Sequence, residues 1–177
     1  MKIVVLSGSP HKHGTTSKLV DSFIAGAEAA GHEVVRFDTA FMKIHPCIAC
    51  EKCHTEYGKC VFEDDMVQIG NTLANSDCVV LATPIYYYGI CSQLKTVIDR
   101  FYAIEESIRK KQKTAFISAM ADDDPKTVKP ANDSYRAAVN WLEWNVVGIV
   151  NAFSCVSVNN LEGTDYEKKA YELGKSI

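Results

Sequence analysis

Residues 2–17 read KIVVLSGSPHKHGTTS, a short apolar run followed directly by a loop of small, hydroxyl-bearing and basic residues. The run from Lys2 to Leu6 has the length and composition of a strand that is buried on both faces of a parallel sheet. The loop from Ser7 to Ser17 contains two glycines and five hydroxyl side chains but no acidic residue, and it leads into a helical pattern. A helix start of this composition favours an anion, because free backbone N–H groups and the helix dipole point at it. The stretch therefore predicts a parallel α/β fold whose first loop binds phosphate.

The remainder of the chain continues the alternation of strands and helices. Further strands are expected at 33–37, 77–83, 114–119 and 149–158, with Pro84 ending the second of these. Apolar residues at helical spacing predict helices at 15–30, 65–74, 92–104, 131–147 and 166–173, and a cysteine-rich loop occupies 44–62. This pattern predicts a flavodoxin-like three-layer α/β/α sandwich with a five-stranded parallel sheet in the order 2-1-3-4-5. The 177 residues fit one such domain, and no internal repeat or linker is visible.

Composition and charge restrict the classes of partner. The chain has 47% hydrophobic and 23% charged residues, and its net charge of -3 argues against a nucleic acid partner. No apolar stretch approaches the ~20 residues of a membrane span. The first apolar run is too short for a signal peptide, so we expect a cytoplasmic protein without membrane contact.

The first loop matches neither of the two common nucleotide motifs. Its glycine spacing differs from both the dinucleotide pattern G-x-G-x-x-G and the P-loop pattern G-x-x-x-x-G-K-[ST]. The alternative interpretation is a capped helix start with Thr15 or Thr16 as the N-cap. Because a cap needs one hydroxyl and the loop offers five, phosphate binding is the preferred interpretation.

A second unusual loop, TPIYYYGICSQLK, spans residues 83–95. Three adjacent tyrosines beyond a buried strand cannot all point into one core, and they suit a flat aromatic ligand. A packed or dimer-forming aromatic patch is the alternative. In the predicted strand order, both loops leave the sheet at its switch point, where ligands bind. Together they predict a ligand with both a phosphate and a planar ring.

These two loops resemble those of the NADPH-dependent FMN reductases. Residues 8–16, GSPHKHGTT, are similar to the GSPRKNGNT-type loop of that family. Residues 83–87 (TPIYY), 93–95 (QLK) and 99–101 (DRF) are similar to its second FMN loop and the helix that follows. The resemblance is strong to about residue 120. His11 stands where relatives often carry Arg, and the segment from His13 to Thr15 departs from the Asn-Gly-Asn form.

The resemblance implies FMN as the cofactor. The residues that it implies for the phosphate are Ser9, His11, Gly14, Thr15, Thr16 and Ser17. Those that it implies along the ribityl chain and ring are Pro84, Ile85, Tyr86, Tyr87, Tyr88 and Gly89. The family also implies NAD(P)H as a donor and a homodimer or homotetramer, which the three tyrosines and the aromatic helix at 141–144 favour as well.

Four of the seven cysteines lie close together. Cys47, Cys50 and Cys53 form C-x2-C-x2-C, and Cys60 follows after six residues, with a turn expected at Gly58. Three thiolates at this spacing are typical of a bacterial ferredoxin run, and a reducing compartment argues against disulfides. Within the family, the iron–sulfur flavoprotein group is the most similar, and this resemblance implies a [4Fe-4S] cluster on the four cysteines. Free thiols or a zinc site are the alternatives, and His45 and His54 are interpreted as solvated loop residues.

Two functions remain open from the sequence. The first is an FMN-dependent oxidoreductase that passes electrons between NAD(P)H or a reduced carrier and an acceptor, with or without the cluster. Its reactive group is the FMN N5 atom, so no catalytic side chain is assigned. The second is a flavodoxin-like electron carrier with no substrate of its own and no cluster. No Ser/His/Asp or paired-carboxylate set supports hydrolysis.

Overall fold

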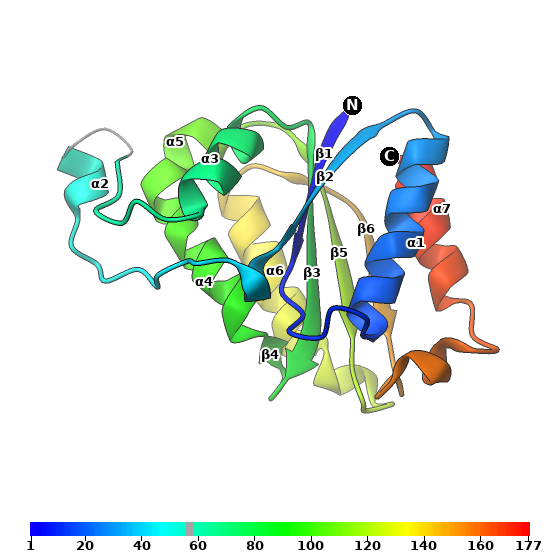
Figure 1. The fold of residues 1–177 in the computed structure, drawn as a ribbon. Coiled ribbons are helices and arrows are strands. Elements are labelled where there is room, and N and C mark those ends of the chain that lie inside the picture. The colour runs from blue at the N-terminus through cyan, green and yellow to red at the C-terminus, as the bar shows by residue number, and fades with distance from the viewer. Residues whose placement is uncertain (56–58) are drawn as a thin grey trace.

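A computed structural model of the chain describes residues 1–55 and 59–177, and its centre is a twisted parallel sheet (Figure 1). The five parallel strands are β1 (Lys2–Ser7), β2 (Glu33–Asp38), β3 (Cys78–Tyr86), β5 (Lys113–Ala119) and β6 (Asn145–Ala152). They lie in the order β2-β1-β3-β5-β6, which confirms the predicted order 2-1-3-4-5. A sixth strand of two residues, β4 (Gly89–Ile90), pairs antiparallel with the end of β3 and was not predicted.

Helices cover both faces of the sheet, as predicted for a three-layer sandwich. On one face, α1 (Thr15–Ala29) packs along α7 (Tyr166–Ser176). On the other face lie α3 (Met66–Ala74), α4 (Ser92–Arg100) and α6 (Lys129–Trp141) (Figure 1). The core is divided accordingly: Val4 and Leu6 of β1 belong to one buried cluster, whereas Ile3 and Val5 belong to the other. Burial on both faces explains why β1 reads as a continuous apolar run.

Short elements complete the fold. They are α2 (Lys52–Thr55), α5 (Glu105–Ile108) and the 3₁₀ turns at Thr39–Phe41, Phe101–Ile104, Pro125–Thr127 and Val158–Leu161. The helix expected at 92–104 is therefore α4 followed by a 3₁₀ turn, and the loop expected at 44–62 contains α2. No helix within the described residues combines the length and apolar character needed to cross a membrane.

The prediction that Pro84 ends the central strand was wrong. β3 continues to Tyr86, and Pro84 pairs with Ala119 of β5. Backbone groups alternate along a strand, and the carbonyl of Ala82 faces β1, where it accepts a hydrogen bond from Gly8 N at 2.8 Å. The Pro84 nitrogen faces the same side, beyond the end of β1, so the strand needs no N–H there.

The boundary between the last long helix and the last strand was also predicted wrongly. Helix α6 ends at Trp141 rather than at 147, and β6 spans Asn145–Ala152 rather than 149–158. Glu143 adopts a left-handed backbone with φ 61, which stops the helix. Asn145 N then donates to Gln112 O at 2.8 Å, and pairing with β5 begins. The apolar residues between 144 and 150 continue the helical spacing by coincidence, and sheet pairing overrides it.

Candidate functional site

A cleft of about 650 Å³ opens at the carboxyl edge of the sheet. This volume lies within the range of sites for drug-sized and cofactor-sized molecules. Four separate segments line it: Ser9, His11, Lys12, His13, Gly14, Thr15 and Thr16; Pro84, Ile85 and Tyr86; Ala119, Met120 and Ala121; and Cys155, Val156, Ser157 and Val158. The two unusual loops thus meet in one cavity, as predicted from the switch point of the sheet.

The start of helix α1 faces this cleft without a side-chain cap. Gly14 occupies the N-cap position, and no side chain accepts a hydrogen bond from the first turn. The Thr15 hydroxyl donates to the carbonyl of Cys155 at 3.4 Å, and the Thr16 hydroxyl has no hydrogen-bond partner within the described part of the chain. The alternative interpretation, in which Thr15 or Thr16 caps the helix, is therefore wrong. The N–H groups of the first turn, which have no partner inside a helix, are available to an anion.

The loop before α1 is held in shape by its own residues and by α4. The Ser9 hydroxyl accepts a hydrogen bond from His11 N at 3.2 Å, which closes a short turn. Gly8 lies so close to α4 that a Cβ there would be 2.6 Å from both Cys91 Sγ and Leu94 Cβ. Sequence reasoning missed this role of Gly8, although a glycine between a strand and a ligand loop is a common sign of close backbone approach.

Ser17 is the one residue predicted for the phosphate that does not line the cleft. Its hydroxyl accepts a hydrogen bond from Arg36 Nη2 at 2.7 Å. The same guanidinium pairs with Asp38 at 2.8 Å and with Asp21 at 2.6 Å. The Ser17 side chain therefore belongs to a polar network on the β2 side of α1, and a direct contact with phosphate stays a prediction.

The three tyrosines form the tip of the β3–β4 hairpin. Tyr86 lines the cleft, whereas Tyr87 and Tyr88 are the turn residues, 100% and 56% exposed, and Gly89 starts β4. Tyr87 and Tyr88 have φ 46 and φ 65, as in a type I′ turn, where asparagine and glycine are preferred. Bulky residues in this conformation are strained, and such strain is often found at functional sites. Burial, together with the neighbouring Cys91, raises the pKa of the Tyr86 hydroxyl.

The two remaining wall segments of the cleft were not predicted. Residues 119–121 comprise the last residue of β5 and the two residues after it, and residues 155–158 follow β6. They carry no phosphate-binding or metal-binding motif. Their position was nevertheless available from the fold, because loops at the carboxyl ends of neighbouring parallel strands share one edge.

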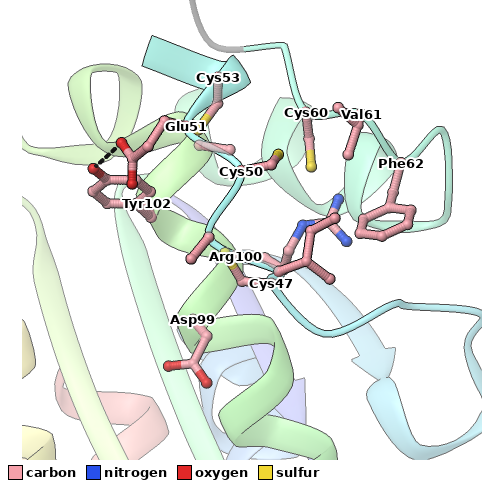
Figure 2. Close-up of a pocket in the computed structure, with 13 residues that line it drawn as sticks. Cys47, Cys50, Glu51, Cys53, Cys60, Val61, Phe62, Asp99, Arg100 and Tyr102 are labelled. Atoms are coloured by element: carbon pink, nitrogen blue, oxygen red, sulfur yellow. Dashed lines mark hydrogen bonds between the residues drawn. The ribbon is translucent and has the colours of Figure 1, made fainter.

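The four clustered cysteines lie away from this cleft and line a second cavity, shown in Figure 2. Cys47 and Cys50 are exposed, and Cys53 and Cys60 are half-buried. In Figure 2 the sulfurs of Cys50 and Cys60 turn toward the same space, beside the guanidinium of Arg100. Burial raises the pKa of the Cys53 thiol, and the nearby Cys60 thiol adds to this effect. The structure thus brings all four predicted ligands to one cavity.

Two residues of this loop have a left-handed backbone. Ala49 and Glu51 lie on either side of Cys50 and have φ 53 and φ 60. Left-handed residues in a short run turn successive N–H groups toward one concavity, an arrangement found at phosphate and iron–sulfur sites. Donor set and backbone together fit a thiolate-bound cluster.

The arrangement of the sulfurs is looser than a finished metal site. Among the described residues, no three His, Cys, Asp or Glu side chains are close enough to hold one metal ion. The cavity holds about 20 Å³, roughly the space of one water, so the loop has to widen to accept a cluster. The turn predicted at Gly58 lies outside the described residues.

The two histidines of the loop do not line the cysteine cavity. His45 is exposed and stacks on Phe62 with ring centroids 4.7 Å apart. His54 is also exposed, and its ring lies 4.2 Å from that of Tyr102, which donates to Glu51 at 2.8 Å. Both positions agree with the interpretation of the histidines as loop residues rather than metal ligands.

Comparison with known proteins identifies relatives of this chain. Residues 1–153 match the family described as NADPH-dependent FMN reductase. An iron-sulfur flavoprotein of Archaeoglobus fulgidus is 31% identical over 179 residues, which cover 100% of this chain and 79% of that protein. Two iron-sulfur flavoproteins of Methanocaldococcus jannaschii are 35% identical to part of the chain, and the matches cover only 51% and 52% of their length.

Solved structures share the fold at low sequence identity. An NAD(P)H:quinone oxidoreductase from Methanothermobacter marburgensis has a TM-score of 0.77 at 15% identity, covering 99% of this chain and 95% of that one. An FMN-dependent NADH-azoreductase from Bacillus anthracis, solved in complex with FMN, has a TM-score of 0.71 at 15% identity, covering 99% and 96%. At this identity the likeness is one of fold.

Proposed function

The chain belongs to the NADPH-dependent FMN reductase family, and from this membership we propose that it is an FMN-dependent oxidoreductase that takes electrons from NAD(P)H or a reduced carrier. Bound FMN supplies the chemistry, because a flavin accepts a hydride as an electron pair and releases electrons singly. The residues of the chain bind the cofactor, orient it and set its electrostatic surroundings. We assign no side chain to proton transfer.

The phosphate of FMN is proposed to bind at the start of α1. The observation that carries this proposal is a helix N-terminus that opens into the cleft without a side-chain cap. The N–H groups of its first turn, the Thr16 hydroxyl and the Ser9 turn surround the position where a dianion is favoured. Lys12, His11 and His13 also line the cleft and add cationic or donor groups.

The flavin ring is proposed to lie against the hairpin of β3 and β4. Pro84, Ile85 and Tyr86 line the cleft, and they place an apolar and aromatic wall next to the phosphate position. Tyr87, Tyr88 and Gly89 continue the wall beyond the cleft as an exposed tip. Two strained tyrosines at full or half exposure suit a surface that a flat ring or a second subunit covers.

The cysteine loop is proposed to hold a [4Fe-4S] cluster on Cys47, Cys50, Cys53 and Cys60. Their spacing, their common cavity and the left-handed residues between them support this assignment. The Archaeoglobus fulgidus relative, whose name states an iron–sulfur flavoprotein, aligns along the whole chain. A cluster would give the flavin a one-electron partner.

We further propose that the chain works as a homodimer or homotetramer. The loop that carries α2 projects on the side of α3 and α4, away from α1 (Figure 1), and none of its described residues lines the cleft. In an oligomer, the cysteine loop of one subunit is expected to approach the flavin of another. This would shorten the electron path.

Purification without oxygen tests the proposal directly. The visible spectrum of the purified chain should show flavin and iron–sulfur bands, and extraction should release FMN. Steady-state oxidation of NAD(P)H by the FMN-loaded chain distinguishes an enzyme from an electron carrier without a substrate. Extraction of FAD, or no flavin after reconstitution, would refute the flavin assignment. A parent chain with one tightly bound zinc, or without iron, would refute the cluster alone.

A further inference from the structure

The cysteine loop is closed at its neck by backbone and carboxylate hydrogen bonds. Asp65 accepts from Lys43 N at 2.7 Å, and Asp65 N donates to the carbonyl of Lys43 at 3.1 Å. One residue earlier, Asp64 accepts from His45 N at 2.9 Å. The chain thus enters the loop before Cys47 and leaves it after Cys60 through one hydrogen-bonded neck, residues 43–45 and 64–65.

Arg100 joins this neck to the body of the domain. It is the last residue of α4, and its side chain is 2% exposed. Its two terminal nitrogens donate to the two carboxylate oxygens of Asp64 at 2.9 and 3.2 Å, and Nη1 also donates to the His45 carbonyl at 2.8 Å. The guanidinium lies 5.5 Å from the centre of the Phe62 ring. One buried side chain therefore contacts both ends of the loop.

The third nitrogen of the guanidinium is unused. Arg100 Nε is buried and has no hydrogen-bond partner among the described residues. Leaving a buried donor without a partner is unfavourable, and more so for a charged group than for a neutral one. Arg100 lines the cysteine cavity, and Figure 2 shows its guanidinium beside Cys47, Cys50 and Cys60. A thiolate or a cluster sulfur in this cavity would supply the acceptor that Arg100 Nε lacks.

We propose that Arg100 is a positioning residue of the cysteine site, which holds the neck of the loop with Asp64 and directs its positive charge and its free Nε–H at the sulfurs. The inference rests on the hydrogen bonds of the neck and on the buried, unpaired Nε, and its redox consequence also rests on the proposed cluster. Stability by itself does not account for such a pair, because a buried ion pair is often no more stable than apolar residues of the same size.

The opposite charges of Arg100 and Asp64 should have opposite effects on the sulfurs. Arg100 favours negative charge on the sulfurs and, in a loaded site, the more negative reduced cluster. Asp64 opposes both effects from the other side of the guanidinium. Loss of Arg100 should therefore act in one direction and loss of Asp64 in the other. If the pair only held the neck together, both variants would loosen the loop. The alkylation rates and the midpoint potential would then shift in the same direction in both.

The first experiment uses the full-length chain without iron. Each cysteine of the loop is alkylated with iodoacetamide at neutral pH, and the rate is followed by peptide mass spectrometry, because the thiolate is the reacting form. Arg100→Met should slow the reaction of the thiols beside the guanidinium by about threefold, because the variant removes a positive charge close to the sulfurs. Asp64→Asn should accelerate it. Arg100→Lys, which keeps the charge, should stay near the parent, and Arg136→Gln on the exposed face of α6 is the control for total charge.

The second experiment uses the reconstituted chain with its cluster. A redox titration followed by electron paramagnetic resonance should show a lower midpoint potential in Arg100→Met and a higher one in Asp64→Asn. Retention of FMN shows that each variant is folded, because the flavin contacts are proposed on other loops.

The outcomes distinguish the proposed role of Arg100 from the proposed cluster on which part of it rests. If the parent takes up no iron, the cluster assignment fails, and the alkylation rates alone decide the role of Arg100. Opposite changes in the two variants support the proposal in either state. Rates and potentials that move in the same direction in both variants, or that remain at the parent values, overturn it.

Discussion

Gly8 lies directly against Cys91: the Cys91 thiol donates to the Gly8 carbonyl at 3.2 Å, and a Cβ at Gly8 would be 2.6 Å from the sulfur. The loop proposed to bind phosphate is thus seated on the residue that precedes α4, the helix whose other end carries Arg100. One helix thereby supports the proposed flavin site at its start and the cysteine loop at its end.

Gly8→Ala should displace the first loop and weaken FMN binding. Overpacking a tight contact costs about 1–3 kcal/mol, so the affinity should fall by about 5- to 150-fold. Fluorescence titration of the flavin-free chain measures the change. The matched control is Gly70→Ala in α3, where the new Cβ would make an ordinary 3.4 Å contact with Ile104. Equal affinity in Gly8→Ala and the parent would show that the loop can shift without loss.

Ser9→Ala and Thr16→Ala should each weaken FMN binding by about 1–3 kcal/mol, the usual effect of removing one partner of a charge-assisted hydrogen bond. Ser9 shapes the loop through His11 N, and the Thr16 hydroxyl lies in the cleft without a partner among the described residues. Thr72→Ala is the control, because among the described residues that hydroxyl bonds within α3, to the Gln68 carbonyl. Unchanged flavin affinity in both variants would place the phosphate elsewhere.

The sequence predicted those parts of the site that have a local chemical signature. The hydroxyl-rich loop, the tyrosine run and the cysteine spacing can each be recognised within fewer than fifteen residues. The strand order places the first two at one edge of the sheet. The wall formed by residues 119–121 and 155–158 has no such signature. Ser17 shares the residue type of its neighbours but turns to Arg36, because its position on the helix decides its direction. The contact of Ser17 with Arg36 can be recognised only from the three-dimensional structure.

Arg100 was part of a recognised motif, DRF at 99–101, but its role could not be predicted. A single arginine at the end of an amphipathic helix is usually solvated. Here it is buried because Asp64, distant in sequence, supplies a bidentate partner. Long-range pairs of this kind leave no periodic pattern, and for the same reason the boundary between α6 and β6 was misplaced by several residues.

Acid should loosen the neck of the cysteine loop. Burial alone would raise the pKa of Asp64, but hydrogen bonds from Arg100, His45 and Met66 and the Arg100 charge hold it below its ordinary value of 3.8. A carboxyl with a lowered folded pKa contributes stability that is fully present above the ordinary value and is lost as the pH falls through the folded value. Urea unfolding of the iron-free parent and of Asp64→Asn should therefore converge below about pH 4. Asp133→Asn, an exposed carboxylate paired with Lys129, is the control. A stability difference that is constant with pH would contradict this prediction.

The chain should associate in solution. Tyr87 and Trp141 are 100% and 61% exposed, and exposed large aromatic side chains are enriched at protein interfaces. Light scattering at micromolar concentration should give a dimer or tetramer mass. Tyr87→Ser and Trp141→Ser indicate whether either surface takes part, since loss of an aromatic anchor at an interface often costs at least about 2 kcal/mol. A monomeric mass for the parent would contradict the prediction.

The four clustered cysteines should behave as one unit toward iron. A [4Fe-4S] cluster needs a thiolate at each iron, so Cys50→Ser should lose most of the iron and acid-labile sulfide after anaerobic reconstitution. FMN should remain, because the cleft contains none of these cysteines. Electron transfer from the flavin to a one-electron acceptor should slow more than reduction of the flavin by its donor.

The control for this prediction is Cys78→Ala, which removes a thiol from the core of β3 rather than from the loop. It should keep its iron even if it loses some stability, since the cavity left by one sulfur is small. Joint loss of all iron in Cys50→Ser, with retention in Cys78→Ala, distinguishes a cluster from iron bound loosely by surface thiols. Partial loss in proportion to the thiols removed would indicate independent sites. In that case the four cysteines would be free thiols around a cavity that stays at about 20 Å³. The chain would then be an FMN reductase without a cluster.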